Sequence, residues 1–155
     1  MSRVAHALLV VTVAAHSTAP RLAAQAHGTP AEAKAMLQKA VAHYQAVGRT
    51  QALADFTSRK APFFDRDLYV VCIGKDRTIV AHGGFPQTVG SSVDVLKDAD
   101  GKPLGQAIID AAASGGPGLV RYHMISPTSS RLQPKVSYVQ KVGDDVCLVG
   151  AYGVS

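Results

Sequence analysis

The stretch Asp65–Gly90, DRDLYVVCIGKDRTIVAHGGFPQTVG, predicts two strands joined by a tight turn. Residues 68–73 are rich in β-branched and aromatic side chains and are apolar at both alternating positions. A strand of this kind needs cover on both faces, so we expect it in the middle of a sheet. Residues 74–77 have the length and residue types of a hairpin turn, and residues 78–82 form the return strand.

The return strand ends in a glycine-rich loop. Gly83-Gly84-Phe85-Pro86 cannot continue a hydrogen-bonded ladder, because Pro86 lacks an N–H group. His82 and Phe85 therefore lie where a strand gives way to a loop. Binding sites are often built at such places, since a rigid sheet holds the loop residues in position.

Length and charge limit the class of protein. At 155 residues we expect one domain whose core needs neither metal nor disulfide. Arg3 and Arg21 are the only charged residues in 1–26, so beyond that segment the 16 basic residues fall to 14, against 11 acidic ones. The basic residues are scattered, with no run longer than Arg59-Lys60. Nucleic-acid binding needs a clustered basic face, so we do not expect a nucleic-acid partner.

Residues 1–26 have the features of a secretory signal peptide. Met1-Ser2-Arg3 gives a positive start, residues 5–15 form an apolar run, and Ala24-Gln25-Ala26 is an A-x-A cleavage site. The apolar run is far shorter than the ~20 residues that a membrane span needs. We expect a mature domain of residues 27–155 that is periplasmic or secreted and has no membrane span of its own.

The two cysteines, Cys72 and Cys147, lie in predicted strands. If the first and last strands are antiparallel neighbours with Asp67 opposite Tyr152, Cys72 lies opposite Cys147. A slip of one residue would place the two thiols on opposite faces. Two alternatives stay open: a disulfide, which export permits and which would contribute roughly 2–4 kcal/mol, or two small buried apolar side chains.

Helices are predicted in two parts of the chain. Residues 29–32, TPAE, form a capping box with proline in the first turn, and apolar residues then recur at helical spacing until Gly48. Thr50 opens a second, short helix. Residues 103–114 predict a third, which begins at a proline and ends at a glycine-rich connection.

Three further strands are predicted at residues 119–126, 134–142 and 146–153. They form a meander, whereas the strands within Asp65–Gly90 form a hairpin. Strands and helices do not alternate regularly, so a parallel sheet is not expected. We predict an α+β fold, with one five-stranded antiparallel sheet, a long N-terminal helix and a further short helix packed on it.

Five motifs occur in order along the chain: RDLYV (66–70), IVAHGGFPQTVG (79–90), LKDADGKP (96–103), GLVRYHMISPTSSRLQPKVSYVQKV (118–142) and LVGAY (148–152). This ordered set resembles the single-Cache extracytoplasmic sensor domains. The resemblance covers roughly residues 33–152 and implies a PAS-like architecture. In that architecture the first and last strands are central neighbours, the long helix covers one face, and a pocket lies on the other.

The resemblance also implies a function. Cache domains typically bind small metabolites such as organic acids or amino acids. We therefore expect a sensor module of the free-standing exported type, which binds a small organic acid or related metabolite and signals through a membrane receptor or kinase. Relatives carry G-W-V-x-Y-x-W-x-N-P, but Leu119 and Met124 replace both tryptophans here, so the identity of the ligand does not carry over.

No enzyme signature is present in the sequence, which has no G-x-S-x-G, HExxH, Rossmann or Walker motif. The four histidines of residues 27–155 are not at metal-ligand spacing, so we predict no catalytic residue, cofactor or metal. Lys135 can hold a carboxylate by charge, and His82 can donate a hydrogen bond. The full set of pocket candidates is Tyr69, His82, Phe85, Tyr122, Met124, Lys135, Tyr138 and Tyr152.

Two other hypotheses remain at this stage. One is an exported interaction or structural domain whose side chains fill the space of the pocket, which the loss of two family tryptophans permits. The other is a haem or metal protein with ligands from His82, His123 and the cysteines. A small-molecule response separates the sensor from the first, and a Soret band or bound metal would reveal the second.

Overall fold

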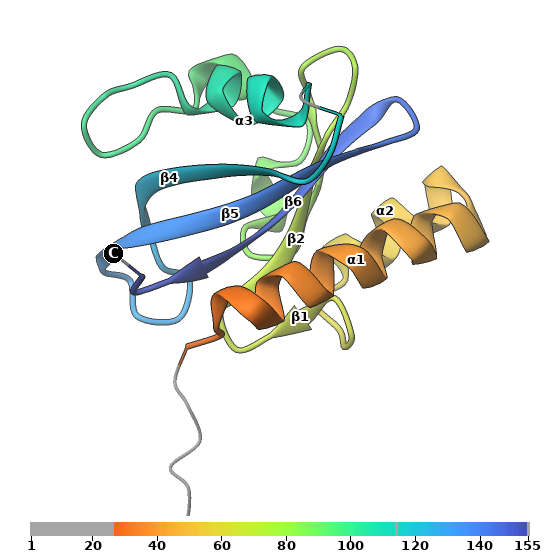
Figure 1. Cartoon of the computed structure of the whole chain (residues 1–155), viewed down its shortest axis with the longest axis horizontal. Helices are drawn as coiled ribbons and strands as arrows, with labels where there is room; N and C mark the ends of the chain where they lie inside the picture. The colour runs from red at the N-terminus through yellow and green to blue at the C-terminus, as the bar shows by residue number, and fades with distance from the viewer. Residues whose placement is uncertain (1–26, 114, 155) are drawn as a thin grey trace, which may run out of the picture.

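The computed structural model describes residues 27–113 and 115–154. The predicted signal peptide, residues 1–26, lies outside this range. The described chain forms one antiparallel sheet with helices on both faces (Figure 1). None of the helices in these two ranges has the length and hydropathy to span a bilayer.

Two helices cover one face of the sheet (Figure 1). α1 (Pro30–Val47) begins with the predicted capping box: the Glu32 N–H donates to the Thr29 side chain, and the Thr29 N–H donates to the Glu32 carboxylate at 2.7 Å. α2 (Arg49–Thr57) follows after Gly48 alone. Gly48 has a φ of 82°, which glycine adopts without strain, so the chain changes direction between the helices within one residue.

The sheet has the order β1-β2-β6-β5-β4, and β3 pairs with the other end of β2. The first long strand and the last strand are central neighbours, so the predicted α+β architecture is confirmed. The strands are β1 (Phe64–Asp65), β2 (Leu68–Ile73), β3 (Ile79–His82), β4 (Gly118–Ile125), β5 (Leu132–Val142) and β6 (Asp145–Tyr152).

One strand was missed by the sequence analysis. β1 has only two residues, and no strand is predicted before residue 68. β1 pairs with the start of β2 across a tight turn, in which Arg66 has a φ of 56°. A strand of two residues has no measurable period, so the alternation of side chains could not reveal it.

The opposite face of the sheet is covered by a helix and two short turns. α3 (Leu104–Ala112) lies on the side away from α1 (Figure 1), and the 3-10 turns η1 (Pro86–Thr88) and η2 (Val93–Val95) belong to the connection that leads to it. α3 ends two residues earlier than predicted. This connection and α3 are the elements that cover the site described below.

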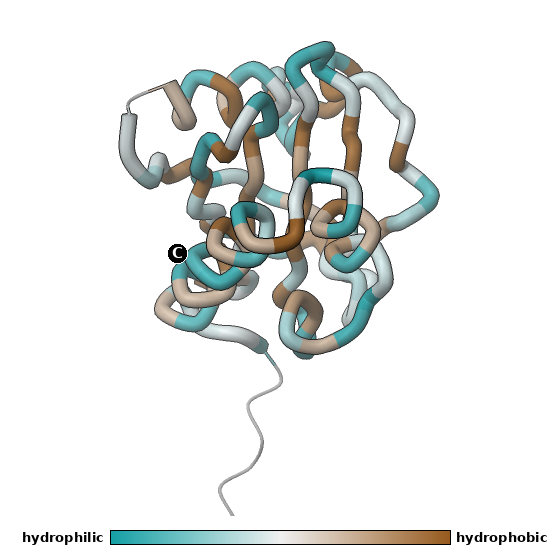
Figure 2. Tube along the Cα trace, turned by 90° about the vertical axis from the view of Figure 1, so that its right-hand side faces the viewer, coloured by the Kyte–Doolittle hydropathy of each residue, from teal (hydrophilic) through white to brown (hydrophobic). Residues whose placement is uncertain are grey.

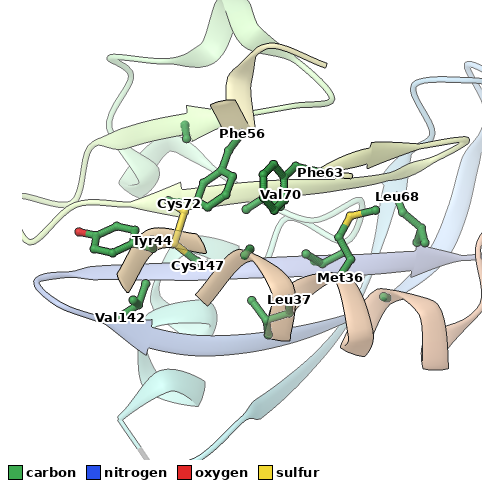
Figure 3. Packing of buried hydrophobic residues seen from close by; sticks show 14 of the residues in the cluster. Met36, Leu37, Tyr44, Phe56, Phe63, Leu68, Val70, Cys72, Val142 and Cys147 are labelled. Carbon is green, nitrogen blue, oxygen red and sulfur yellow. A yellow bond between two sulfur atoms is a disulfide. The ribbon is translucent and has the colours of Figure 1, made fainter. Parts of the chain in front are cut away.

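The sheet divides the apolar interior into two clusters. One lies between the sheet and α1 and α2, and contains Leu37, Phe56 and Val70 (Figure 3). The other lies between the sheet and α3, and contains Ile108 and Leu148. In Figure 2 hydrophobic segments recur along the strands, while hydrophilic segments lie in outer loops and on turns of the helices. Burial on both faces explains why β2 and β6 are apolar almost throughout.

The register between β2 and β6 is the one assumed from the sequence. Val70 lies opposite Val149, and Cys72 lies opposite Cys147. The sulfur atoms of Cys72 and Cys147 are bonded to each other, and both side chains are buried in the cluster under α1 (Figure 3). The bond therefore links the two central strands at the middle of the sheet.

A buried carboxylate fixes the two N-terminal helices to the last strand. Asp145, at the start of β6, is fully buried. It accepts hydrogen bonds from the Tyr44 hydroxyl at 2.8 Å and from Arg49 Nε at 2.9 Å. Burial and the Asp145 charge raise the pKa of Tyr44 to about 12, so the phenol remains a donor. The ion pair with Arg49 and the hydrogen bond from Tyr44 together compensate the free-energy cost of burying the Asp145 carboxylate.

We predict that loss of the disulfide lowers stability without changing the fold. The bond closes a loop of 75 residues, for which the chain-entropy estimate is about 4 kcal/mol. The double variant Cys72→Ala/Cys147→Ala should lose about this much free energy of unfolding, as measured by urea denaturation. Dithiothreitol should destabilise the wild type by a similar amount and leave the double variant unchanged. Equal stability of the oxidised and reduced wild type would contradict the prediction.

Candidate functional site

A cavity of about 300 Å³ lies between the sheet and α3. Its floor is formed by residues of β2, β4 and β6 together with Lys135 of β5, and its cover by the connection after β3 and by α3. The described chain thus lacks the filled core that the interaction-domain hypothesis requires. Six of the predicted pocket residues line the cavity: Tyr69, His82, Phe85, Tyr122, Met124 and Lys135.

The strand period brings these residues together. Lys135 lies opposite Tyr122 of β4 on one side and opposite Tyr152 of β6 on the other. Side chains that are directly opposite in a sheet share a face, so these three residues point towards the same side. Tyr69 joins them from β2, because its hydroxyl reaches both the Tyr152 hydroxyl, at 2.7 Å, and the Lys135 ammonium.

Tyr138 does not line the cavity, so its place in the predicted pocket was wrong. It lies on β5, three residues from Lys135, and an odd separation places two strand residues on opposite faces. Tyr138 instead packs partly buried against the cluster under α1. The alternation of β5 was visible in the sequence and already separated these two residues.

Lys135 is buried without an ion pair. The residue is 4% exposed, and its Nζ donates a hydrogen bond to the Tyr69 hydroxyl at 2.8 Å. Nζ also lies 4.2 Å from the ring centroids of both Tyr69 and Tyr152, so the ammonium contacts two π faces. Within residues 27–113 and 115–154, Lys135 forms no salt bridge with a carboxylate.

The carboxylate whose charge acts on Lys135 is already engaged. Asp67 raises the pKa of Lys135 through its negative charge, but burial has the larger effect and lowers that pKa to about 7. The Asp67 carboxylate is fully buried and is bonded to His27 Nδ1 and to the Gly28 N–H, both at 2.7 Å. Asp67 thus tethers the segment before α1 to the sheet and leaves Lys135 without a direct counter-ion.

The tyrosines form a directed chain of hydrogen bonds from the ammonium. The Tyr152 hydroxyl donates to the backbone carbonyl of Ile125 at 3.2 Å. The Tyr69 hydroxyl therefore donates to Tyr152 and accepts from Lys135. Burial raises the pKa of both Tyr69 and Tyr152, so the two phenols remain neutral. Neutral phenols solvate the ammonium but do not cancel its charge.

His82 offers a neutral donor to the same cavity. Its Nδ1 accepts a hydrogen bond from the Phe85 N–H at 2.9 Å, so the ring proton is on Nε2. Burial, and then the charge of Lys135, lowers the pKa of His82 to about 4. The ring stacks on Tyr69, with centroids 5.3 Å apart. In the described part of the chain Nε2 has no hydrogen-bond partner of its own.

Two glycines, which have no side chain to contact a ligand, leave space for the side chains of Tyr69 and Lys135. A Cβ on Gly84 would lie 2.6 Å from the Tyr69 ring, and a Cβ on Gly150 would lie 2.3 Å from Cε of Lys135. Gly84 belongs to the glycine-rich loop at which the sequence predicts a binding site, whereas Gly150 was not predicted to be part of the site. The sequence gives no signal for Gly150, because only the register of β5 against β6 places it beneath the lysine.

The geometry rules out the predicted alternative of a shared metal or haem site. The two cysteines are bonded to each other on the α1 face of the sheet, whereas His82 lines the cavity on the other face. His123 is exposed on β4, next to Tyr122, and strand alternation turns it away from the cavity face. These residues therefore cannot act on one bound group.

The family model described as Single Cache domain 2 matches residues 7–151. The chain belongs to the single Cache family. The match begins within the segment predicted to be a signal peptide, which lies outside the described residues. Single Cache domains are sensory modules that bind ligands rather than enzymes, in agreement with the absence of an enzyme motif in the sequence.

Solved structures share the fold of this Cache domain. A methyl-accepting chemotaxis protein from Vibrio parahaemolyticus RIMD 2210633 is 23% identical, with a TM-score of 0.67 over 79% of this chain and 86% of that one. A Cache chemosensory domain described for its carboxylic acid recognition is 23% identical, with a TM-score of 0.58 over 77% and 85%. A periplasmic sensor domain of a chemotaxis protein is 22% identical, with a TM-score of 0.58 over 77% and 87%. No curated protein sequence matches the chain.

We predict that Lys135 makes the stability of this Cache domain depend on pH. The lysine pKa falls from 10.5 in the unfolded chain to about 7 in the folded one. Between these values the unfolded state binds more protons, so stability rises with pH. Relative to Lys135→Met, the wild type should gain on the order of 2 kcal/mol of unfolding free energy between about pH 7 and about pH 9, as measured by urea denaturation.

The matched control for this measurement is Lys141→Met. Lys141 lies on the same strand but is exposed, so its removal should leave the pH dependence of the wild type intact. Parallel stability curves for the wild type and Lys135→Met across this range would show that the lysine keeps its ordinary pKa, and would contradict the prediction.

Proposed function

We propose that this Cache domain is an exported sensor that binds a small organic acid at Lys135 and His82 and signals through a membrane partner. The observation that carries the proposal is the Lys135 ammonium, which is buried at an open cavity without a counter-ion. Lysine is almost never fully buried unless it is paired. A ligand carboxylate would supply the missing partner.

The chemistry of the site suits a carboxylate. Lys135 has donor capacity beyond its single bond to Tyr69, because an ammonium has three protons. His82 adds a neutral N–H donor without adding a charge. A charge-assisted hydrogen bond in a site shielded from water is stronger than the same bond in solvent. One anionic group held by Lys135 and His82 would therefore satisfy both donors.

The similar structures support this choice of ligand and of output. One of them is a Cache domain described for carboxylic acid recognition, and two belong to chemotaxis proteins. A domain that senses outside the cytoplasm needs a membrane component to pass its state inward. The signal-peptide features of residues 1–26 agree with a periplasmic or secreted location.

We predict that replacing Lys135 abolishes binding of small monocarboxylates. Thermal unfolding of the wild type should shift upward in a dose-dependent manner with acetate, propionate or butyrate. At a hundredfold excess over the dissociation constant, binding to the folded state alone adds about 2.7 kcal/mol. Lys135→Met should show no shift, because the ligand loses its counter-ion, whereas Lys141→Met should respond like the wild type. Full response in Lys135→Met would remove this lysine from the site.

We also predict that binding takes up a proton at and above neutral pH. A bound carboxylate raises the pKa of Lys135, which is about 7 in the free domain, so the complex holds a proton that the free site partly lacks. Affinity should therefore fall as the pH rises from about 7 to about 9. Calorimetry in two buffers that differ in ionisation enthalpy would measure the uptake. Affinity that is constant over this range would contradict a titrating lysine in the site.

A further inference from the structure

We infer that the ligand of this site is a monocarboxylate with an apolar tail of medium length, rather than acetate, a dicarboxylate or an amino acid. The inference rests on the proposed function, because it assumes that Lys135 holds the carboxylate. It goes further because it assigns the apolar part of the cavity to the tail of the ligand. The assignment follows from the volume of the cavity and from the separation of its polar and apolar ends.

The volume of the cavity is larger than the smallest carboxylic acids would fill. At 300 Å³ the cavity has room for about ten non-hydrogen atoms, if each takes the ~30 Å³ that a water molecule occupies in the liquid. A ligand such as hexanoate, octanoate or phenylacetate approaches this size. Acetate would occupy only the part next to Lys135 and would leave the remainder unfilled.

The cavity is polar at one end and apolar at the other. Along β2 its floor runs from Tyr69 through Val71 to Ile73, a length of roughly 13 Å at the rise of an extended strand. Lys135 and its hydrogen-bond partner Tyr69 lie at the first end. At the other end the lining comes from Ile73 and Ile79 of the hairpin.

The cover of the apolar end comes from α3 and the segment before it. Leu104 and Ile108 line the cavity from α3, and Leu96 lines it from the connection. Leu104 and Ile108 are buried in the cluster under α3. A tail that extends from the carboxylate would therefore be enclosed by aliphatic side chains on both the sheet side and the helix side.

The described lining offers no partner for a second charge. It contains no aspartate, glutamate or arginine, and its remaining hydroxyls are engaged. The Thr88 hydroxyl donates to the Phe85 carbonyl at 2.8 Å, and the Tyr122 hydroxyl is paired with Ser137 Oγ at 2.8 Å. A second carboxylate or an α-ammonium group would be buried without compensation, which is costly. An apolar tail would incur no such cost.

The first experiment is a calorimetric titration of the full chain with straight-chain acids from acetate to octanoate. Each added methylene should tighten binding about fourfold, the equivalent of the ~0.8 kcal/mol of a buried CH₂, until the cavity is full. Hexanoate, which has four more methylenes than acetate, should therefore bind roughly 250-fold more tightly. Adipate, which carries a second carboxylate on a chain of the same length, should bind far more weakly than hexanoate.

A pair of neighbouring substitutions on α3 tests the location of the tail. Ile108 lines the cavity and Ile109 does not. Ile108→Phe should fill the apolar end, remove the preference for hexanoate and keep the affinity for acetate within a few fold. Ile109→Phe should leave the whole series unchanged. If Ile108→Phe fails to fold, the comparison of hexanoate with acetate and adipate on the wild type still decides the inference.

The outcomes separate the inference from the function on which it rests. Tightening along the series, with adipate weak, supports both. Binding of acetate with equal or weaker binding of hexanoate overturns the apolar-tail assignment and leaves the carboxylate sensor standing. Binding of hexan-1-ol as tight as that of hexanoate overturns the role of Lys135, and with it the monocarboxylate class. Absence of binding by every acid in the series overturns both proposals.

Discussion

The site depends on one interaction, the burial of the Lys135 ammonium against two tyrosine rings without a carboxylate beside it. Water would solvate this charge better than the phenols do, so the folded state holds it at a cost in free energy. A ligand that brings a negative charge would recover that cost on binding. The same burial lowers the pKa of Lys135 to about 7, which connects stability and binding to the pH of the surroundings.

Contacts on the other face of the sheet, under α1 and α2, offset the free-energy cost of burying Lys135. The disulfide links the two central strands under α1, and Asp145 joins Tyr44 and Arg49 of the helical layer to β6. This face contains the larger set of packed aliphatic and aromatic side chains. With that layer packed and cross-linked, the face under α3 can contain a cavity and an unpaired charge.

Much of the architecture could be read from local patterns. The capping box at Thr29 and Glu32 predicted the start of α1, and the doubly apolar run of residues 68–73 predicted a central strand. The cavity residues were predicted less completely. Tyr138 was misassigned because its residue type outweighed the strand period, and Gly150 was missed because its role is to leave space. The aliphatic lining could be recognised only as core, since a cavity wall and a filled core have the same composition.

The sequence by itself determined the helices and the longer strands, the antiparallel sheet and the family, because these follow from periodicity, capping and an ordered set of motifs that are local in the chain. Only the tertiary structure decided that Lys135 lies buried beside Tyr69 and Tyr152, that Asp67 is engaged elsewhere, and that the space beneath α3 is open. Those facts depend on contacts of Tyr69 with Lys135 and with Tyr152, which are 66 and 83 residues away from it in the chain. Burial and the pKa of Lys135 are properties of that assembled environment, and no local pattern encodes them.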